Sequence, residues 1–182
     1  MDQVKPLQSW WTGPDDLSAL LRFQWDDDYL YLAAQVIDDV HFQPSVGGST
    51  WLGDSIQIAF AVDGRFAYEL TLARTADGDQ VYAHRALQGE TGLWDDVRFA
   101  TRRIGQSCFY EAAIPWSRLA PLRPEQGQAI RMNFIVNDND GAGRLGYLEA
   151  RPGIGEQKRA DECYDWPLHG PRRNRPEPPT PD

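Results

Sequence analysis

A tryptophan and two polar residues mark one segment of the chain whose residue types could bind a ligand. Trp51 ends a loop and leads into an expected strand, on which Gln57 lies opposite the apolar Ile56 and Ile58. Glu69, on the next expected strand, can share the face of Gln57. An indole ring can cover the C–H face of a pyranose while amide and carboxylate groups take its hydroxyls. The pattern predicts a sugar-binding surface, and an ordinary solvated sheet face is the alternative.

A second polar segment begins at Asn137 and offers oxygen ligands for a metal ion. Its spacing of Asp138 and Asp140 is that of part of a calcium loop, but the downstream Glu of an EF-hand is not in place. We therefore expect, as one interpretation, a calcium site built from several loops, with Asp39 as a further ligand. An Asp/Asn-rich turn that caps its own backbone is the alternative.

The common catalytic motifs do not occur in this sequence. It has no GxSxG, no Gly-rich phosphate loop and no HExxH, and His41, His84 and His169 are widely spaced. A pair of glycosidase carboxylates can assemble in space rather than in sequence, yet no single carboxylate stands out for that role. The chain is predicted not to be an enzyme.

Alternation with a period of two dominates the chain and predicts an all-β protein. Asp/Gly turns separate the expected strands, and no long helical stretch interrupts them, which favours an antiparallel β-sandwich. One helical turn is expected at 116–119. The expected strands cover residues 17–25, 29–37, 55–62, 66–73, 80–86, 97–103, 109–114, 130–136 and 145–150.

Length and charge narrow the classes of partner. The 182 residues fit one domain, expected over 1–169, followed by a proline-rich linker or disordered tail over 170–182. The formal net charge of -9 argues against nucleic acid and against an anionic membrane surface.

The compartment follows only in part from the sequence. The first residues contain no apolar run, so neither a signal peptide nor a transmembrane helix is predicted. The protein is expected outside the cell or at its surface if the chain belongs to a larger secreted protein, and in the cytosol otherwise. Cys108 and Cys163 could pair, but the sequence alone does not bring them together.

A series of short motifs extends in a fixed order to about residue 168. The motifs are DLSA (16–19), WDDDYLY (25–31), VIDDVH (36–41), WLGDSIQ (51–57), YEAAIPW (110–116), Asn137-Asp138 and PGIG (152–155). Together they resemble the family 9 carbohydrate-binding modules and their DOMON-like relatives.

This resemblance implies a jelly-roll or immunoglobulin-like sandwich, of the kind appended to xylanases and to other polysaccharide-acting or surface proteins. Members hold a terminal sugar between two aromatic rings, hydrogen-bond it with polar side chains and carry structural calcium. By motif, Trp51 is the first ring, and Gln57, Glu69 and Asn137 are polar ligands. Tyr147 is the expected second ring.

Two further residues belong to the expected site, and two positions depart from the family pattern. Arg144 precedes Tyr147 and is a candidate ligand-binding residue, and Trp166 is the reserve for the second ring. Xylanase-appended members are expected to carry Glu at the Gln57 position and Arg at the Glu69 position.

The resulting hypothesis is a non-catalytic module that binds a sugar or polysaccharide chain end, xylan among the candidates, and tethers a covalently linked catalytic domain or a surface protein. The first alternative is a DOMON-like haem or electron-transfer domain, for which Met132 is a mid-strand candidate ligand without an evident histidine partner. The second is a structural sandwich without a ligand.

Overall fold

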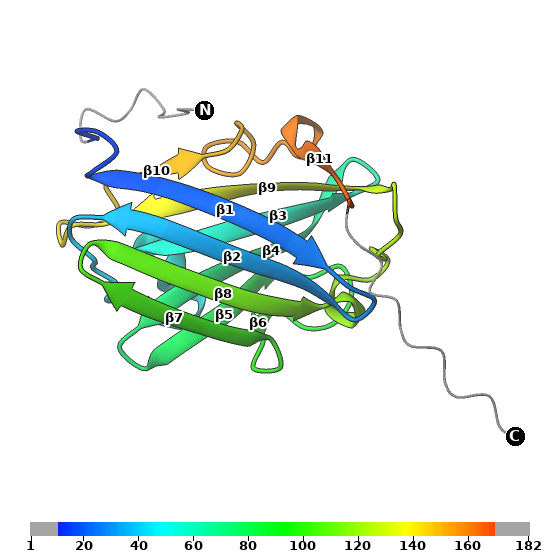
Figure 1. The fold of residues 1–182 in the computed structure, drawn as a ribbon, viewed down its shortest axis with the longest axis horizontal. Coiled ribbons are helices and arrows are strands. Elements are labelled where there is room, and N and C mark those ends of the chain that lie inside the picture. The colour runs from blue at the N-terminus through cyan, green and yellow to red at the C-terminus, as the bar shows by residue number, and fades with distance from the viewer. Residues whose placement is uncertain (1–10, 170–182) are drawn as a thin grey trace, which may run out of the picture.

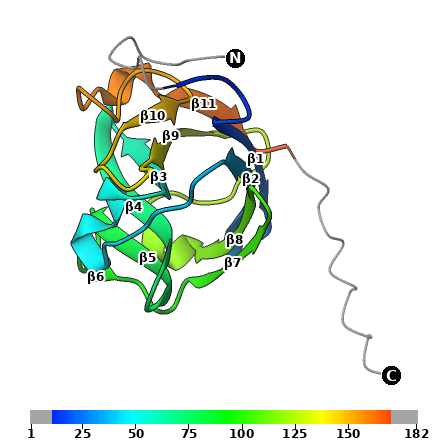
Figure 2. The same ribbon diagram turned by 90° about the vertical axis from the view of Figure 1, so that its left-hand side faces the viewer.

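The computed structural model describes residues 11–169, which form two antiparallel β-sheets packed face to face (Figures 1 and 2). The predicted antiparallel β-sandwich is confirmed. The tail expected over 170–182 lies outside the described residues.

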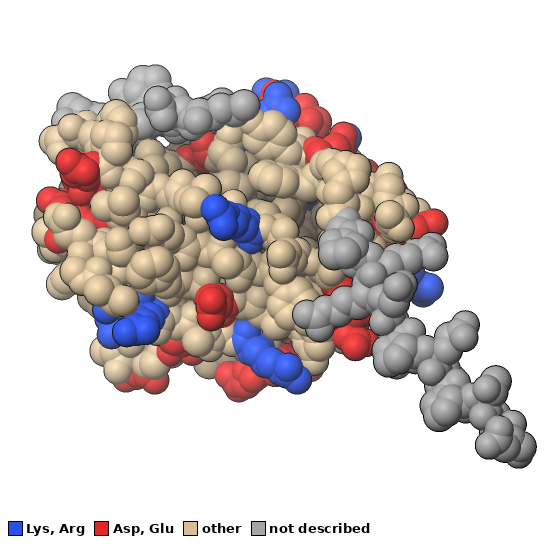
Figure 3. All heavy atoms as spheres, in the orientation of Figure 1, with Lys and Arg blue, Asp and Glu red and all other residues tan. Residues whose placement is uncertain are grey.

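The smaller sheet has four strands in the order β1-β2-β8-β7 and faces the viewer in Figure 1. Its strands are β1 (Leu17–Trp25), β2 (Tyr29–Asp38), β8 (Ser107–Pro115) and β7 (Arg98–Ile104). The outer surface of this sheet is largely uncharged, with charged side chains that stand apart from one another (Figure 3).

The larger sheet has seven strands, in the order β10-β9-β3-β4-β5-β6, with β11 also paired to β9. Its central strands are β3 (Ser55–Val62), β4 (Arg65–Thr75), β5 (Gly78–Arg85) and β9 (Ala129–Asp138). Its short strands are β6 (Gly92–Leu93), β10 (Gly146–Glu149) and β11 (Tyr164–Pro167). Both β10 and β11 pair with β9 and lie one after the other along it, β10 at its end and β11 at its start.

The helical content of the described residues consists of three 3-10 segments, η1 (Gly47–Leu52), η2 (Trp116–Leu119) and η3 (Ala160–Glu162). The segment η2 is the helical turn expected at 116–119, whereas η1, η3, β6 and β11 were not foreseen. Between residues 11 and 169, none of the helices has the length and apolar character needed to cross a membrane.

The core lies between the sheets and is built by alternation along each strand. On β2 the inward side chains of Leu30, Leu32, Ala34 and Val36 are at most 5% exposed, as the period of two predicts. The outward neighbours are more exposed. Met132, the residue considered for haem, is 1% exposed within this core.

Local turn chemistry explains where two of the hairpins form. Asp26 accepts the backbone N–H groups of Asp28 and Tyr29 at 2.9 and 2.8 Å, which closes the β1-β2 turn. Asp63 and Gly64 both have positive φ, 50° and 73°, which is the conformation of a two-residue hairpin turn.

The two cysteines are free and buried in different parts of the fold. Cys108 lies in the main core and Cys163 in a small cluster with Ala61 and Ala160. The two cysteines therefore do not form a disulfide with each other.

Candidate functional site

A row of polar side chains lies on the face of the larger sheet that points away from the core. We call Gln57, Glu69, Thr71, His84 and Asn137 the polar face. Gln57 pairs with Thr71 across β3 and β4, so both side chains point the same way. Glu69 lies one pleat further along the same face, diagonal to Gln57, as the sequence predicts.

Hydrogen bonds fix the orientation of these side chains. Asn137 Nδ2 donates to Ser55 Oγ at 3.0 Å and to Gln57 Oε1 at 3.2 Å. Thr71 Oγ1 and His84 Nε2 lie 2.8 Å apart in a second hydrogen bond. The amide and hydroxyl groups are therefore preorganised before any ligand arrives.

The polar face is more enclosed than the open sheet surface that the sequence pattern suggests. Gln57 is 7% exposed, Glu69 6% and Asn137 1%. The segment η1, which carries Trp51, lies against β3, β4 and β5, and Figure 2 shows this segment outside the larger sheet. Lys158, from the loop after β10, reaches Glu69. Loops therefore turn the sheet face into a covered site.

Two aromatic rings and one guanidinium meet at the edge of the polar face. The Cζ atom of Arg144 lies 5.5 Å from the centre of the Trp51 ring and 4.6 Å from that of the Tyr147 ring. Its Nε donates to Asn137 Oδ1 at 2.9 Å. We call Trp51, Arg144 and Tyr147 the ring slot. The two predicted rings and the predicted arginine are thus brought together, with the guanidinium close to both rings.

The rings differ in exposure, and a glycine makes room for the inner one. Trp51 is 37% exposed and Tyr147 only 6%. A Cβ atom on Gly155 would lie 2.2 Å from Tyr147 Cζ, so only glycine fits this position without displacing the ring. Glu149 Oε1 holds that loop by accepting the N–H groups of Ile154 and Gly155 at 2.6 and 3.1 Å.

Burial sets the protonation of the groups around the ring slot. It lowers the pKa of Arg144, against a smaller opposing effect of Tyr147 and Glu149. It raises the pKa of Tyr147 to about 12, with Glu149 adding to the effect, and it lowers the pKa of His84. At neutral pH the site therefore offers a charged guanidinium, a neutral phenol and a neutral imidazole.

Two contacts neutralise the buried carboxylate of the polar face. Lys158 Nζ forms an ion pair with Glu69, and Arg85 Nε lies 3.9 Å from its other oxygen. Both cations are at least half exposed, so they lie at the surface of the site, whereas the Glu69 side chain is buried.

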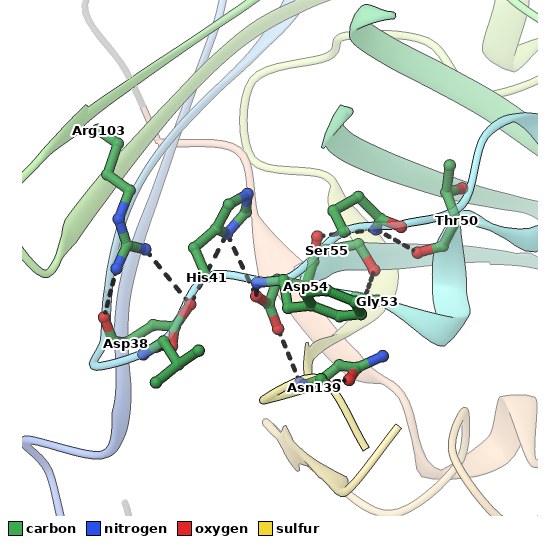
Figure 4. A network of polar contacts seen from close by, with 12 residues as sticks. Asp38, His41, Thr50, Gly53, Asp54, Ser55, Arg103 and Asn139 are labelled. Carbon is green, nitrogen blue, oxygen red and sulfur yellow. Dashed lines mark hydrogen bonds and ion pairs between the residues drawn. The ribbon is translucent and has the colours of Figure 1, made fainter. Parts of the chain in front are cut away.

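The loop that carries Trp51 is anchored by a polar network (Figure 4). Gln43 Nε2 donates to the carbonyl oxygens of Thr50 and Asp54 at 2.7 and 3.0 Å. Asp54 in turn accepts the N–H of Asn139 at 2.8 Å, which ties this loop to the end of β9. The backbone on both sides of Trp51 is therefore fixed by hydrogen bonds.

A histidine between two carboxylates extends the same network. His41 Nδ1 lies 3.3 Å from Asp54 and 3.7 Å from Asp38, and Arg103 lies 3.5 Å from Asp38 (Figure 4). Burial opposes the charged imidazole, but the two carboxylates outweigh it and raise the pKa of His41 to about 9. Burial also raises the pKa of Asp54 to about 6, against the opposing effect of His41. This is a buried ion-pair network.

Five carboxylates gather beside this network, and we call them the acidic cluster. Two groups of three have oxygens within 4.8 Å of one another and share Asp140. The groups are Asp16, Asp39 and Asp140, and Asp38, Asp138 and Asp140. The predicted ligands Asp39, Asp138 and Asp140 are thus all present, but Asp39 and Asp138 fall in different groups.

Asp138 is the buried centre of the acidic cluster. It is 2% exposed, and its Oδ2 has no hydrogen-bond partner within residues 11–169. Burial raises its pKa to about 8, and the charges of Asp140, Asp54, Asp38 and Asp16 add to this. An unpartnered buried oxygen among carboxylates is a donor set that fits a hard cation such as Ca²⁺.

Several residues of the site were not foreseen, and one reserve candidate lies elsewhere. Trp166 packs against Phe23, with ring centres 5.5 Å apart, on the core side of the sheet. His84 could have been found, because it alternates with core residues on the strand paired to β4. Lys158 lies in a loop without periodicity, so no sequence signal places it beside Glu69.

A hollow of about 540 Å³ lies apart from the polar face, at the edge between β1 and the strands β10 and β11. Its lining is mainly aromatic and aliphatic and includes Trp11, Phe134 and Trp166. Few polar groups converge there, in contrast to the ring slot.

The fold and this arrangement define a β-sandwich with an aromatic and polar site on its larger sheet. The family model "Carbohydrate family 9 binding domain-like" matches residues 2–151. The chain belongs to this family. A search of curated protein sequences found no significant match.

Solved structures support the same fold. A family 9 carbohydrate-binding module from Caldicellulosiruptor kristjanssonii in complex with cellotriose is 18% identical, with a TM-score of 0.69, over 93% of this chain and 84% of that one. A module from the same organism in complex with glucose is 20% identical, with a TM-score of 0.61, over 90% and 82% of the chains. A putative carbohydrate-binding protein from Bacteroides uniformis is 14% identical, with a TM-score of 0.53, over 78% and 72%.

Proposed function

We propose that this protein is a non-catalytic module that binds a sugar at the ring slot and the polar face. The observation that carries the proposal is that Trp51 and Tyr147 both lie close to the guanidinium of Arg144, which is itself hydrogen-bonded to the amide of Asn137. Aromatic rings beside fixed amide and carboxylate groups suit a pyranose, which has apolar C–H faces and a polar rim. The complexes of similar modules with cellotriose and glucose support this class of ligand.

The expected affinity is modest. Stacking of one sugar buries on the order of 100–200 Å² of apolar area, worth about 2–5 kcal/mol before ordering costs. With hydroxyl hydrogen bonds added, binding falls roughly between millimolar and tens of micromolar. Weak binding is useful in a module that tethers an attached catalytic domain, because linkage supplies a high effective concentration. Such a partner, and a location outside the cell or at its surface, are part of the proposal.

A catalytic role receives no support from the hydroxyl–imidazole pair on the polar face. Thr71 hydrogen-bonds His84, which is an arrangement that can activate a nucleophile. The side chain of Thr71 is, however, fully buried, so its hydroxyl does not reach a ligand. The pair is better explained as a structural hydrogen bond between β4 and β5.

The proposal includes structural calcium at the acidic cluster. The unpartnered oxygen of Asp138 and the neighbouring oxygens of Asp38 and Asp140 would bind the ion, and Asp16 and Asp39 would complete its surroundings. The charge of the ion would relieve the repulsion among these carboxylates. It would also fix the end of β9 at Asp138.

A calorimetric titration tests the sugar-binding proposal. Glucose, xylose and cellotriose are titrated into the protein and into two variants, Trp51→Ala and Tyr31→Ala. Tyr31 is the matched control, because it is also 37% exposed but lies on the smaller sheet. We expect binding of at least one sugar to be lost in Trp51→Ala and kept in Tyr31→Ala. Equal affinities in the two variants, or no heat with any sugar, would contradict the proposal.

A further inference from the structure

The guanidinium of Arg144 occupies the space in which a sugar held by both rings would lie. Its contacts to the two rings, at 5.5 and 4.6 Å, limit the separation of the ring centres to the sum of these distances. Its Nε is held by Asn137 Oδ1 at 2.9 Å. A ligand must therefore either displace this side chain or bind against it.

Arg144 differs from three of the other partly buried arginines in having no carboxylate partner within residues 11–169, whereas Arg151, which stacks on Tyr164, resembles it in this respect. Arg103 pairs with Asp38, Arg118 with Asp96 and Arg131 with Asp165. Arg144 forms no such ion pair within residues 11–169. Burial lowers the pKa of Arg144, and the charges of Tyr147 and Glu149 oppose this effect only in part.

The carboxylates near Arg144 already have other partners, so its guanidinium can pair with an anionic ligand. Glu69 already meets two cations, Lys158 and Arg85. Glu149 is the carboxylate whose charge reaches Arg144, and its Oε1 is taken up by two backbone N–H groups. The planar N–H fork of a guanidinium matches a carboxylate better than it matches a hydroxyl.

We propose that Arg144 makes the site selective for a sugar that carries a carboxylate, namely a hexuronic acid residue; this inference rests on the proposed function. The sugar covers Trp51, the exposed ring, and its carboxylate pairs with the terminal nitrogens of Arg144. The guanidinium keeps its stacking on Tyr147 and its hydrogen bond to Asn137. A neutral sugar would have to break these contacts to enter the ring slot, with no ion pair gained in return.

A comparison of charged and uncharged sugars of the same shape tests this selectivity. D-glucuronate and D-galacturonate are each titrated against their amides, with glucose as a neutral reference, into the protein, Arg144→Gln and Arg98→Gln. Arg98 is the matched control, because its guanidinium also stacks on a tyrosine, 5.1 Å from the Tyr29 ring, but on the smaller sheet. We expect at least one acid to bind about tenfold or more tightly than its amide.

The variants separate the role of Arg144 from general charge effects. The preference for the acid should fall to within about twofold in Arg144→Gln and stay unchanged in Arg98→Gln. If the glutamine variant unfolds, Arg144→Lys, which keeps the charge without the fork, should retain only part of the preference. Equal binding of acid, amide and glucose by the unchanged protein would overturn the inference and leave the proposed function standing. A failure of neutral and acidic sugars alike would instead overturn the proposed function.

Discussion

Asn137 and Asp138 are neighbours on β9, yet their side chains serve two regions of opposite character. Asn137 enters the polar face, where Ser55, Gln57 and Arg144 all hydrogen-bond to it. Asp138 enters the acidic cluster, where its Oδ2 has no partner in the described part of the chain. The separation follows from the pleat of a strand, which sends consecutive side chains to opposite faces.

The difference indicates which region is complete without a ligand. In the polar face and the ring slot, hydrogen bonds, stacking and ion pairs within the protein hold the side chains in place. In the acidic cluster, like charges crowd around a buried oxygen, which is stable only when protons or a cation neutralise them. The first region is therefore expected to keep its shape without a sugar, whereas the second should depend on its ion.

Calcium should give the largest effect on stability. At a free concentration about one hundred times its dissociation constant, the ion should raise the free energy of unfolding by about 2.7 kcal/mol. The variant Asp138→Asn should lose this gain but keep its sugar affinity. Denaturant titrations with calcium and with chelator measure both effects, and a gain that survives in Asp138→Asn would place the ion elsewhere.

The calcium effect should depend on pH, because protons compete with the ion at Asp138. Without metal, the pKa of this group is raised to about 8, so the folded protein holds a proton that the unfolded chain releases near pH 4. Its contribution to the stability of the metal-free protein is therefore present at low pH and is lost as the pH rises through 8. Calcium should stabilise more at pH 8 than at pH 5.5. A constant difference between these pH values would contradict the role of Asp138.

Asn137→Ala should destabilise the protein by about 2 kcal/mol, because it leaves the buried polar groups of Gln57 and Arg144 without their partner. Sugar affinity should fall as well, while the gain from calcium should remain. Unfolding and sugar titration of this variant beside Asp138→Asn test the separation directly. If each change affected both ligands equally, the two regions would form a single site.

Gly155→Ala should affect only the ring of Tyr147. The added methyl group would overlap the end of Tyr147, at a cost of about 1 kcal/mol, since the contacted atoms belong to a side chain that can shift. We expect weaker sugar binding with an unchanged calcium response. A sugar affinity equal to that of the unchanged protein would show that the position of the Tyr147 ring does not affect sugar binding.

Glu69→Gln should have the smallest effect on stability, below about 1 kcal/mol, because its partners Lys158 and Arg85 are half exposed. The side chain keeps its shape and can still hydrogen-bond a hydroxyl. Thermal unfolding and sugar titration measure the change. A large loss of stability would mean that the carboxylate supports the fold rather than the ligand.

Alternation along the strands made most of the fold predictable from the sequence. The inward residues of β2 and the Asp63-Gly64 turn follow from period and turn chemistry alone. The short strands β6 and β11 were not predicted, because two to four residues carry too little periodicity to distinguish a strand from a loop.

The residues of the site could be predicted from the sequence, but the loops that cover it could not. Trp51, Arg144 and Tyr147 were all expected to contact a ligand, and the structure brings them together. The contacts of Arg144 with both rings and the contact of Lys158 with Glu69 depend on loop geometry, which local sequence does not determine. For the same reason, no pattern indicates that Asp39 and Asp138 fall in separate groups of carboxylates.

The most direct test of the account is a map of backbone and side-chain resonances during a sugar titration. The sugar with the highest affinity is added to isotope-labelled protein while amide, indole and guanidinium signals are followed. We expect the largest shifts at the Trp51 indole, the Asn137 side-chain amide and the Gly155 N–H, with none on the outer face of the smaller sheet. Shifts centred on β1, β2, β7 and β8, with the Trp51 signal unmoved, would contradict the placement of the sugar at the ring slot.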